Sequence, residues 1–142
     1  GSGLVGSEMC IRDSHDRYLK ESEFNKERFV WIKPYAEMHD NRRKVVLSHY
    51  PIFCYNGQYR RNKKGEPLTY MLYGHVHDTL DEQLVRQFCQ ITRQTKKQGK
   101  YDEEPLPIPC NMINCFCMYS DYIPRTLDEW IDYYSLGEDR RK

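Results

Sequence analysis

The sequence lacks any long apolar run and any large excess of one charge. Its apolar stretches are only a few residues long, whereas a membrane-spanning helix needs about 20 apolar residues. The 142 residues carry 22 Lys and Arg against 21 Asp and Glu, a formal net charge of +1, so overall charge does not steer the chain toward nucleic acid or anionic membrane. No charged-then-apolar leader of a signal peptide is recognisable. We therefore expect a cytoplasmic protein without a membrane partner.

Disorder is excluded by the composition. Aromatic residues make up 13% of the chain and hydrophobic residues 39%, more than in the weakly hydrophobic segments that stay unfolded. A chain of this length fits one domain, which can bury a core without disulfides or structural metals. The composition therefore indicates a single globular domain.

Six cysteines are present, and their even number alone would suit a disulfide framework. Because nothing else in the sequence indicates export, we expect free thiols, most of them buried. The spacing of Cys110, Cys115 and Cys117 is C-x4-C-x-C, which matches no common zinc site. A buried strand explains this segment better than zinc, which is kept as the less favoured alternative.

Hydrophobic patterning predicts a mixed α/β fold. Short β-prone runs bounded by Pro, Gly and Asp-Asn turn signals predict strands. A longer stretch has apolar residues at i, i+1, i+4 and i+7 from Leu84 to Ile91, which predicts an amphipathic helix with this stripe buried. Thr126 and Glu129 have the spacing of a capping box, which opens a second helix. The predicted strands are residues 29–32, 35–38, 44–49, 69–73 and 111–118, and the predicted helices are residues 81–98 and 126–134.

The two ends of the chain differ from the middle. Residues 1–14 open with Gly and Ser, and their apolar residues follow neither the helical nor the strand period. We interpret them as a non-native leader and leave them out of the fold prediction. Residues 138–142 are all charged and are expected to form a frayed tail. The predicted domain is therefore residues 15–137.

Three histidines follow the ends of predicted strands. His49 closes the apolar run that starts at residue 44, and His75 and His77 come just after the run 69–73 and a glycine. Ligand sites in open α/β sheets gather where strands end. In an extended chain, residues two apart face opposite sides, so His75 and His77 can serve two neighbouring metal ions. A lone loop histidine carries little information, but the two motifs together predict a metal site.

The motifs VVLSHYP and YGHVHD, in this order and spacing, resemble the calcineurin-like metallophosphoesterase superfamily, and most closely its small bacterial and phage-type members. The resemblance covers about residues 15–131. It implies the C-terminal part of a metallophosphoesterase α/β/β/α sandwich that lacks its N-terminal strands. His49 and His75 then bind one metal, and His77 binds the other. His15 and Asp16 are then catalytic, with His15 acting on the leaving oxygen or the transition state and Asp16 orienting it.

The sequence departs from the superfamily in ways that matter for activity. Asp13 and Ser14 stand where the superfamily has Gly and a metal-binding Asn, and the upstream Asp-x-His and bridging Asp are not in this chain. Residues 13–15 do not serve as that Asp-x-His, because no apolar strand precedes them and too few residues separate them from His49. Two-metal hydrolysis needs ions about 3.5–4 Å apart, which three histidines without a bridging carboxylate do not hold.

We therefore expect a truncated, weakly active or inactive fragment of a metal-dependent phosphoesterase, an enzyme that hydrolyses phosphomonoesters or phosphodiesters. The intact protein would use two divalent transition metals, and imidazole ligands suit Mn, Fe, Ni or Zn. Sheet edges left open by missing strands would favour self-association.

The loop that follows His49 is the candidate for substrate contacts. From its position it would cover the metal site, where Arg60 could bind a phosphate and Tyr55 or Tyr59 could stack on a base, with Asn56 between them. Two other functions stay open at this point. One is a non-catalytic metal- or nucleotide-binding remnant. The other is a nucleic-acid-binding module that uses residues 42–44, residues 60–64 and the tyrosines.

Overall fold

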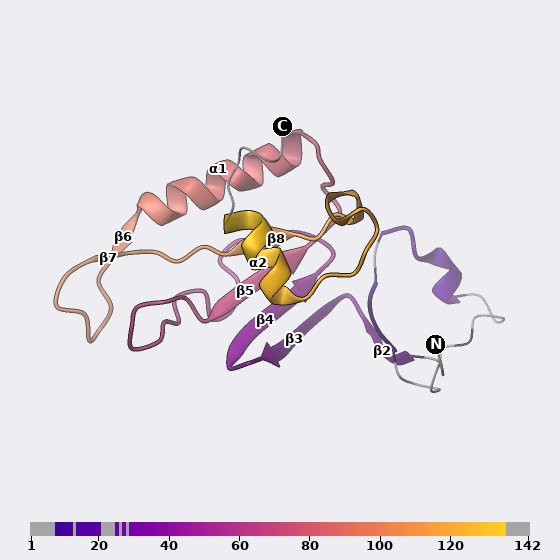
Figure 1. Cartoon of the computed structure of the whole chain (residues 1–142), viewed down its shortest axis with the longest axis horizontal. Helices are drawn as coiled ribbons and strands as arrows, with labels where there is room; N and C mark the ends of the chain where they lie inside the picture. The colour runs from indigo at the N-terminus through magenta and orange to yellow at the C-terminus, as the bar shows by residue number, and fades with distance from the viewer. Residues whose placement is uncertain (1–7, 13, 21–24, 26, 28, 136–142) are drawn as a thin grey trace.

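The computed structural model describes residues 8–12, 14–20, 25, 27 and 29–135 (Figure 1). In chain order the elements are β1 (Glu8–Ile11), η1 (Arg17–Lys20), β2 (Phe29–Lys33), β3 (Tyr35–Asp40), β4 (Arg43–Ser48), β5 (Thr69–Tyr73), α1 (Leu80–Gln94), β6 (Lys96–Lys97), β7 (Leu106–Pro107), β8 (Met112–Asn114), η3 (Cys117–Ser120) and α2 (Leu127–Ser135), where η marks a 3-10 helix. None of the helices in these residues has the length and apolar character needed to cross a bilayer. The predicted tail, residues 138–142, lies outside the described residues.

A four-stranded sheet in the order β3-β4-β5-β8 forms the centre of the fold. β3 pairs antiparallel with β4 through a two-residue turn in which Asn41 and Arg42 have φ angles of 48° and 68°, a backbone that matches the twist of a hairpin. β4, β5 and β8 are parallel, so their carboxyl ends meet at one edge of the sheet. The predicted α/β class is confirmed, while the metallophosphoesterase sandwich stays a prediction.

The core lies between this sheet and α1. Val46, Met71 and Met112 come from three neighbouring strands and form one cluster with Val85 and Cys89 of α1. Alternate residues of β5 are buried, as expected when one face of a strand meets a helix. This packing fixes the orientation of β4, β5 and β8, and therefore the position of the edge where they end.

The buried face of α1 differs from the predicted stripe. Leu84 and Ile91 are 52% and 65% exposed, and the buried residues of the helix are Glu82, Val85 and Cys89. Half of the predicted stripe is confirmed, since Val85 is buried and Phe88 packs against the core. Leu84 and Ile91 face solvent instead, and the buried ion pair of Glu82 with Arg86 occupies part of the inner face. Periodicity of apolar residues alone does not reveal such a helix orientation.

Two predicted elements are longer than the observed ones. α1 ends at Gln94 instead of residue 98 because Thr95 is extended, with φ −78° and ψ 133°, and residues 96–97 pair with β7. The predicted strand 111–118 is observed only as β8, since the chain after Asn114 turns into η3. The buried-strand explanation of the cysteine-rich segment therefore holds for its first half only.

A strand forms inside the segment that the sequence analysis set aside. β1 pairs in parallel with β2, and the backbone N–H of Arg12 donates to Lys33 O at 2.8 Å. The Ile11 side chain lies with Leu47 and Leu72 at the ends of β4 and β5. Leaving residues 8–11 out of the fold was therefore wrong, because a four-residue strand is too short to show a period. The interpretation of residues 1–14 as non-native stays a prediction.

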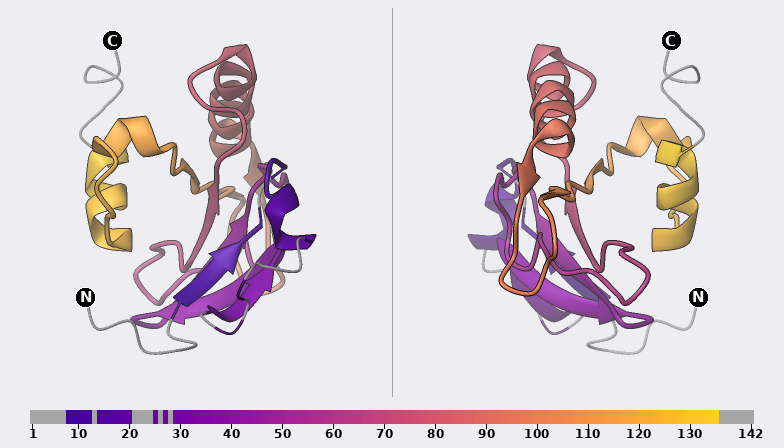
Figure 2. Two further views of the ribbon diagram at one scale, coloured as in Figure 1. Left: turned by 90° about the vertical axis from the view of Figure 1, so that its right-hand side faces the viewer. Right: turned by 90° about the vertical axis from the view of Figure 1, so that its left-hand side faces the viewer.

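α2 stands apart from α1 (Figure 2) and begins with the predicted capping box, which is confirmed. The backbone N–H of Glu129 donates to Thr126 Oγ1 at 3.2 Å, and the backbone N–H of Thr126 donates to Glu129 Oε2 at 2.6 Å. The helix is tied to β8 by Tyr134, whose hydroxyl accepts a hydrogen bond from Asn114 N at 2.9 Å.

Thr126→Ala is expected to lower the free energy of unfolding by about 1 kcal/mol, because it leaves the Glu129 N–H at the start of α2 without its acceptor. Urea unfolding followed by circular dichroism measures the change. Thr126→Ser keeps the hydroxyl and should retain most of the stability. Equal stability of the alanine variant and the wild type would show that the capping box contributes nothing.

Candidate metal centre

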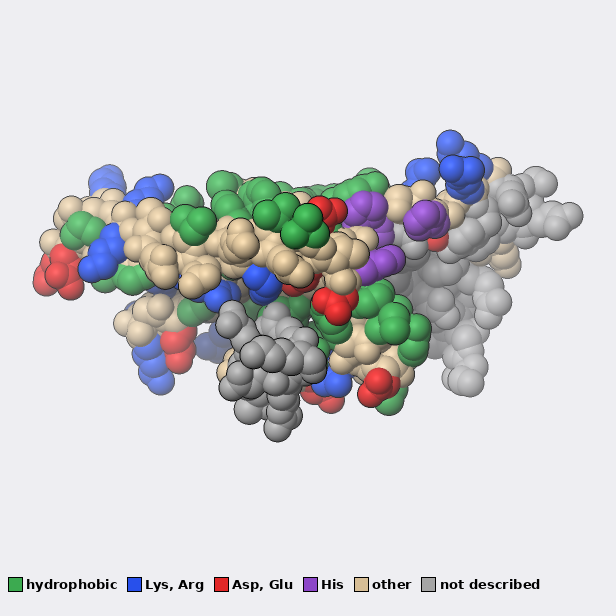
Figure 3. Space-filling view, turned by 90° about the horizontal axis from the view of Figure 1, so that it is seen from above, with side chains coloured by type: hydrophobic (Ala, Val, Ile, Leu, Met, Phe, Trp, Pro, Cys, Tyr) green, Lys and Arg blue, Asp and Glu red, His purple; other side chains and the backbone are tan. Residues whose placement is uncertain are grey.

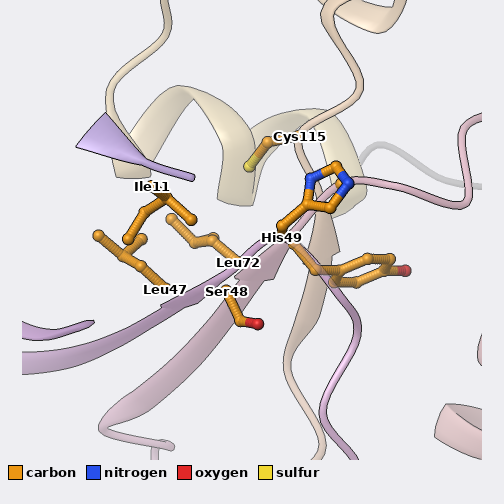
Figure 4. Close-up of a pocket in the computed structure, with 8 residues that line it drawn as sticks. Ile11, Leu47, Ser48, His49, Leu72 and Cys115 are labelled. Carbon is orange, nitrogen blue, oxygen red and sulfur yellow. The ribbon is translucent and has the colours of Figure 1, made fainter. Parts of the chain in front are cut away.

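The carboxyl ends of β4, β5 and β8 line an open hollow of about 300 Å³. Figure 4 shows Ile11, Leu47 and Leu72 gathered on one side of it, with His49 and Cys115 on the other. Ser48, Tyr73 and Gly74 complete the lining. This is the edge at which the sequence analysis placed the ligand site, because parallel strands bring their ends together.

His49 and His75 meet at this edge. His49 Nε2 lies 3.1 Å from His75 Nδ1, and the ring centroids are 4.9 Å apart at 76°. The ring of Tyr50 packs 4.4 Å from that of His75. The structure therefore brings together two histidines that are 26 positions apart in the sequence.

The spacing of the two nitrogens fits a shared metal ion. Nitrogen ligands lie about 2.0–2.1 Å from zinc, so two of them on one ion are about 2.8–3.4 Å apart for angles between about 90° and about 109°. In the structure the two nitrogens share a hydrogen bond, and their separation of 3.1 Å falls in this range. Imidazole nitrogens are ligands that Mn, Fe, Ni and Zn accept.

The backbone of the His75–His77 segment is unusual. His75 and His77 have φ angles of 57° and 48°, the left-handed region that non-glycine residues adopt rarely and that clusters at functional sites. Val76 between them is only 7% exposed and anchors the segment in the core. Gly74 does not have a positive φ, so the left-handed residues of this turn are the two histidines.

The side chain of His77 contacts different residues from those that the side chain of His75 contacts. Its ring stacks on Phe116, with centroids 4.6 Å apart and planes 14° apart, and its carbonyl accepts a hydrogen bond from Asn114 Nδ2 at 2.8 Å. The side chains of His75 and His77 therefore lie on different sides, as the sequence predicted. The backbone that separates them is left-handed, however, and not the extended chain on which the prediction was based. Asn114 is fully buried and positions this segment, a role that the sequence reasoning missed.

The segment with His15 and Asp16 also reaches this site. Ser14 Oγ lies 3.4 Å from His49 Nε2, so the structure brings the residue before His15 to the histidine pair. His15 is exposed and Asp16 half-buried. Their proximity to the site is thus indicated through Ser14, and their catalytic roles stay predictions.

No group of three or more His, Cys, Asp or Glu side chains that could hold a metal occurs among the described residues. Cys115 lines the hollow, but burial raises the pKa of its thiol to about 12, so it is protonated at neutral pH. Cys110 is buried and Cys117 exposed, and the three do not form a zinc cluster. The ligands that the described residues offer at this edge are therefore the two imidazoles.

In the loop after His49, Tyr50 packs on the histidine pair, but the predicted substrate-contact residues 55–60 do not cover it. Tyr55 is buried, and its hydroxyl accepts a hydrogen bond from the backbone N–H of Asn111 at 2.8 Å. Asn56 donates to Glu37 Oε1 at 2.8 Å. Tyr59 lines a different hollow, beside Lys97. The prediction that this part of the loop lies over the metal site was wrong, because the chain returns there to the start of β5. A role in substrate binding for Tyr55, Asn56, Tyr59 and the exposed Arg60 stays a prediction.

A buried polar network of Tyr73, Glu82 and Arg86 lies next to the strand end that precedes His75. Tyr73, the last residue of β5, donates its hydroxyl hydrogen to Glu82 Oε2 at 2.6 Å, and Arg86 Nη2 donates to Tyr73 Oη at 2.7 Å. Burial raises the pKa of Tyr73, which keeps the phenol protonated as a donor. The only sequence signal for this network is the i, i+4 spacing of Glu82 and Arg86.

Comparison of the chain with protein-family models, with curated proteins and with solved structures gives no significant match. The geometry at the ends of β4 and β5 and the two histidine motifs are therefore the observations that bear on function.

Proposed function

We propose that the edge formed by His49 and His75 is part of a metal-dependent phosphoesterase site. The observation that carries the proposal is the 3.1 Å separation of His49 Nε2 and His75 Nδ1 at the carboxyl ends of two parallel strands. The left-handed backbone at His75 supports the proposal further, because non-glycine residues in this conformation cluster at functional sites.

His49 and His75 hold one divalent transition metal in this proposal. When bound, such an ion supplies Lewis acidity toward a phosphoryl oxygen and lowers the pKa of a bound water. His15 donates a proton to the leaving oxygen, and Asp16 orients its imidazole. The substrate is a phosphomonoester or a phosphodiester.

The proposal includes only slow hydrolysis of phosphoesters by this chain. Two imidazoles carry no negative charge, so they do not offset the repulsion between two cations at about 3.5–4 Å. The described residues hold one metal loosely rather than two tightly, since they add no carboxylate to the pair. The same site without turnover would be a metal-binding remnant.

Hydrolysis of bis-(p-nitrophenyl) phosphate and p-nitrophenyl phosphate with added Mn²⁺ tests the proposal. We expect slow, chelator-sensitive release of nitrophenol that His49→Ala abolishes, and His15→Ala should reduce the rate about 100-fold or more if His15 is the general acid. His39→Ala is the matched control, because His39 is an exposed residue of β3. Metal binding that depends on His49 but comes without any hydrolysis would overturn the proposed phosphoesterase function and show a metal-binding site only. Hydrolysis that persists in His49→Ala would place the activity elsewhere.

A further inference from the structure

Two segments far apart in the sequence come together at the end of the sheet opposite the histidines. Lys97 Nζ lies 4.3 Å above the ring of Tyr59, and the Arg61 guanidinium donates to the carbonyl of Pro107. Together, residues 59–64 and residues 96–100 form what we call the cationic end. It contains a hollow of about 440 Å³, whose lining includes Tyr59, Arg61, Lys97, Lys100, Leu106 and Ile108.

Positive charge is concentrated at the cationic end, although the chain as a whole is nearly neutral. The sequence of residues 59–64 is YRRNKK and that of residues 96–100 is KKQGK, which hold Lys and Arg but neither Asp nor Glu. All of these cations are exposed except the half-buried Arg61. Figure 3 shows Lys and Arg side chains, with acidic ones beside them, at the end that carries β6 and β7, and a further group of Lys and Arg side chains at the opposite end, beyond the histidines.

Four acidic side chains, Glu66, Asp102, Glu103 and Glu104, lie near the seven Lys and Arg residues of this surface, and Asp102 also lines the hollow. Asp102 accepts a hydrogen bond from the backbone N–H of Gly99 at 2.7 Å and closes the turn that carries Lys100. A side chain at Gly99 would meet the Asp102 carboxylate at 2.6 Å, so the turn is built around this contact. Glu66 accepts a hydrogen bond from Asn62 at 2.6 Å. Glu103 and Glu104 follow the turn and are exposed.

Aromatic rings stand among the cations. Tyr59 is 51% exposed and Tyr101 is 89% exposed, and Lys100 Nζ lies 5.4 Å from the Tyr101 ring. Exposed rings beside flexible cations are the combination that binds single-stranded nucleic acid, since bases stack on the rings while the cations pair with phosphates.

We propose that the cationic end binds single-stranded nucleic acid, with Lys97 and Lys100 on the phosphates and Tyr59 and Tyr101 stacked on bases. The contacts of Lys97 with Tyr59 and of Arg61 with Pro107 carry the proposal, because they unite two basic segments around one hollow. The proposal is independent of the metal site, which lines a separate hollow.

Fluorescence anisotropy with a labelled oligo-dT of about 12 nucleotides, a length within the usual site sizes, tests this on the full chain at several salt concentrations. Lys97→Ala/Lys100→Ala should weaken binding and reduce the slope of log K against log[salt] by about 1.4, or about 0.7 for each lost phosphate contact. Tyr101→Ala should weaken binding about 10-fold and leave the slope unchanged. Arg17→Ala/Lys20→Ala removes two exposed cations from η1 and should change neither.

An abasic oligomer of equal length separates stacking from charge. It carries the same phosphates without bases, so we expect it to bind about 10-fold or more weakly and to be insensitive to Tyr101→Ala. Equal binding of the abasic oligomer would overturn the proposal in favour of a general polyanion surface. Absent binding of oligo-dT, tighter binding to a duplex or to phosphatidylserine vesicles, or equal losses in the η1 control would overturn it as well.

Discussion

Replacing His49 or His75 with alanine is expected to weaken Mn²⁺ or Zn²⁺ binding by at least about 100-fold. Losing a residue that only orients a ligand already costs about 10–100-fold in metal affinity, and each of these variants removes a direct ligand. The loss should be this large because the described residues offer no third His, Cys, Asp or Glu to the pair. Metal content after loading and desalting, measured by inductively coupled plasma mass spectrometry, gives the stoichiometry for each variant.

Two further variants locate the ion. His39→Ala should keep all of the bound metal, since His39 is exposed on β3 and pairs with Lys44 in the sheet. His77→Ala should also keep it in a one-metal site, because its ring stacks on Phe116. Metal retained by both His49→Ala and His75→Ala would disprove the site. Loss in His77→Ala would show that His77 turns toward the pair when metal binds.

The histidine site was predictable because it depends on a general property of sheets. β4 and β5 are short apolar runs, each is followed closely by a histidine, and parallel strands place their carboxyl ends together. The sequence therefore predicted a ligand site at these strand ends, and the resemblance to the metallophosphoesterases implied that His49 and His75 bind the same metal. The capping box of α2 was predictable for a similar reason, because Thr126 and Glu129 interact within one helical turn.

Features that depend on long-range packing were not predictable. Tyr55 looks like an exposed loop residue, yet it is buried by contacts with the chain before β8. The cationic end joins segments about 35 residues apart, and it exists only because α1 stops at Gln94 and the chain turns into β6. The buried carboxylate of Glu82 is compensated by Arg86 one turn later, which a hydrophobic pattern treats as two exposed charges.

Arg86→Met is expected to lower the free energy of unfolding by about 3–5 kcal/mol, because breaking one side of a buried ion pair leaves the other charge uncompensated. Arg86 Nε lies 3.0 Å from Glu82 Oε1, and Glu82 is only 5% exposed. Arg86 Nη2 also donates to Met112 O at 2.7 Å, so the variant removes a tie between α1 and β8. Methionine is also unbranched and has a similar helix propensity, so the change tests the charge and its hydrogen bonds.

Urea unfolding of Arg86→Met, Glu82→Gln and the double variant measures the coupling between the two residues. The double variant should be more stable than Arg86→Met alone, because the neutral amide that Glu82→Gln introduces costs less to bury than a carboxylate that has lost its guanidinium partner. Gln87→Met is the matched control on the same helix, since Gln87 is exposed and its replacement should change stability by less than about 0.5 kcal/mol. Because Tyr73 links this network to the segment that holds His75, Arg86→Met should also weaken metal binding, whereas Gln87→Met should not. A stable Arg86→Met variant with intact metal binding would show that the network neither holds the fold nor positions the histidines.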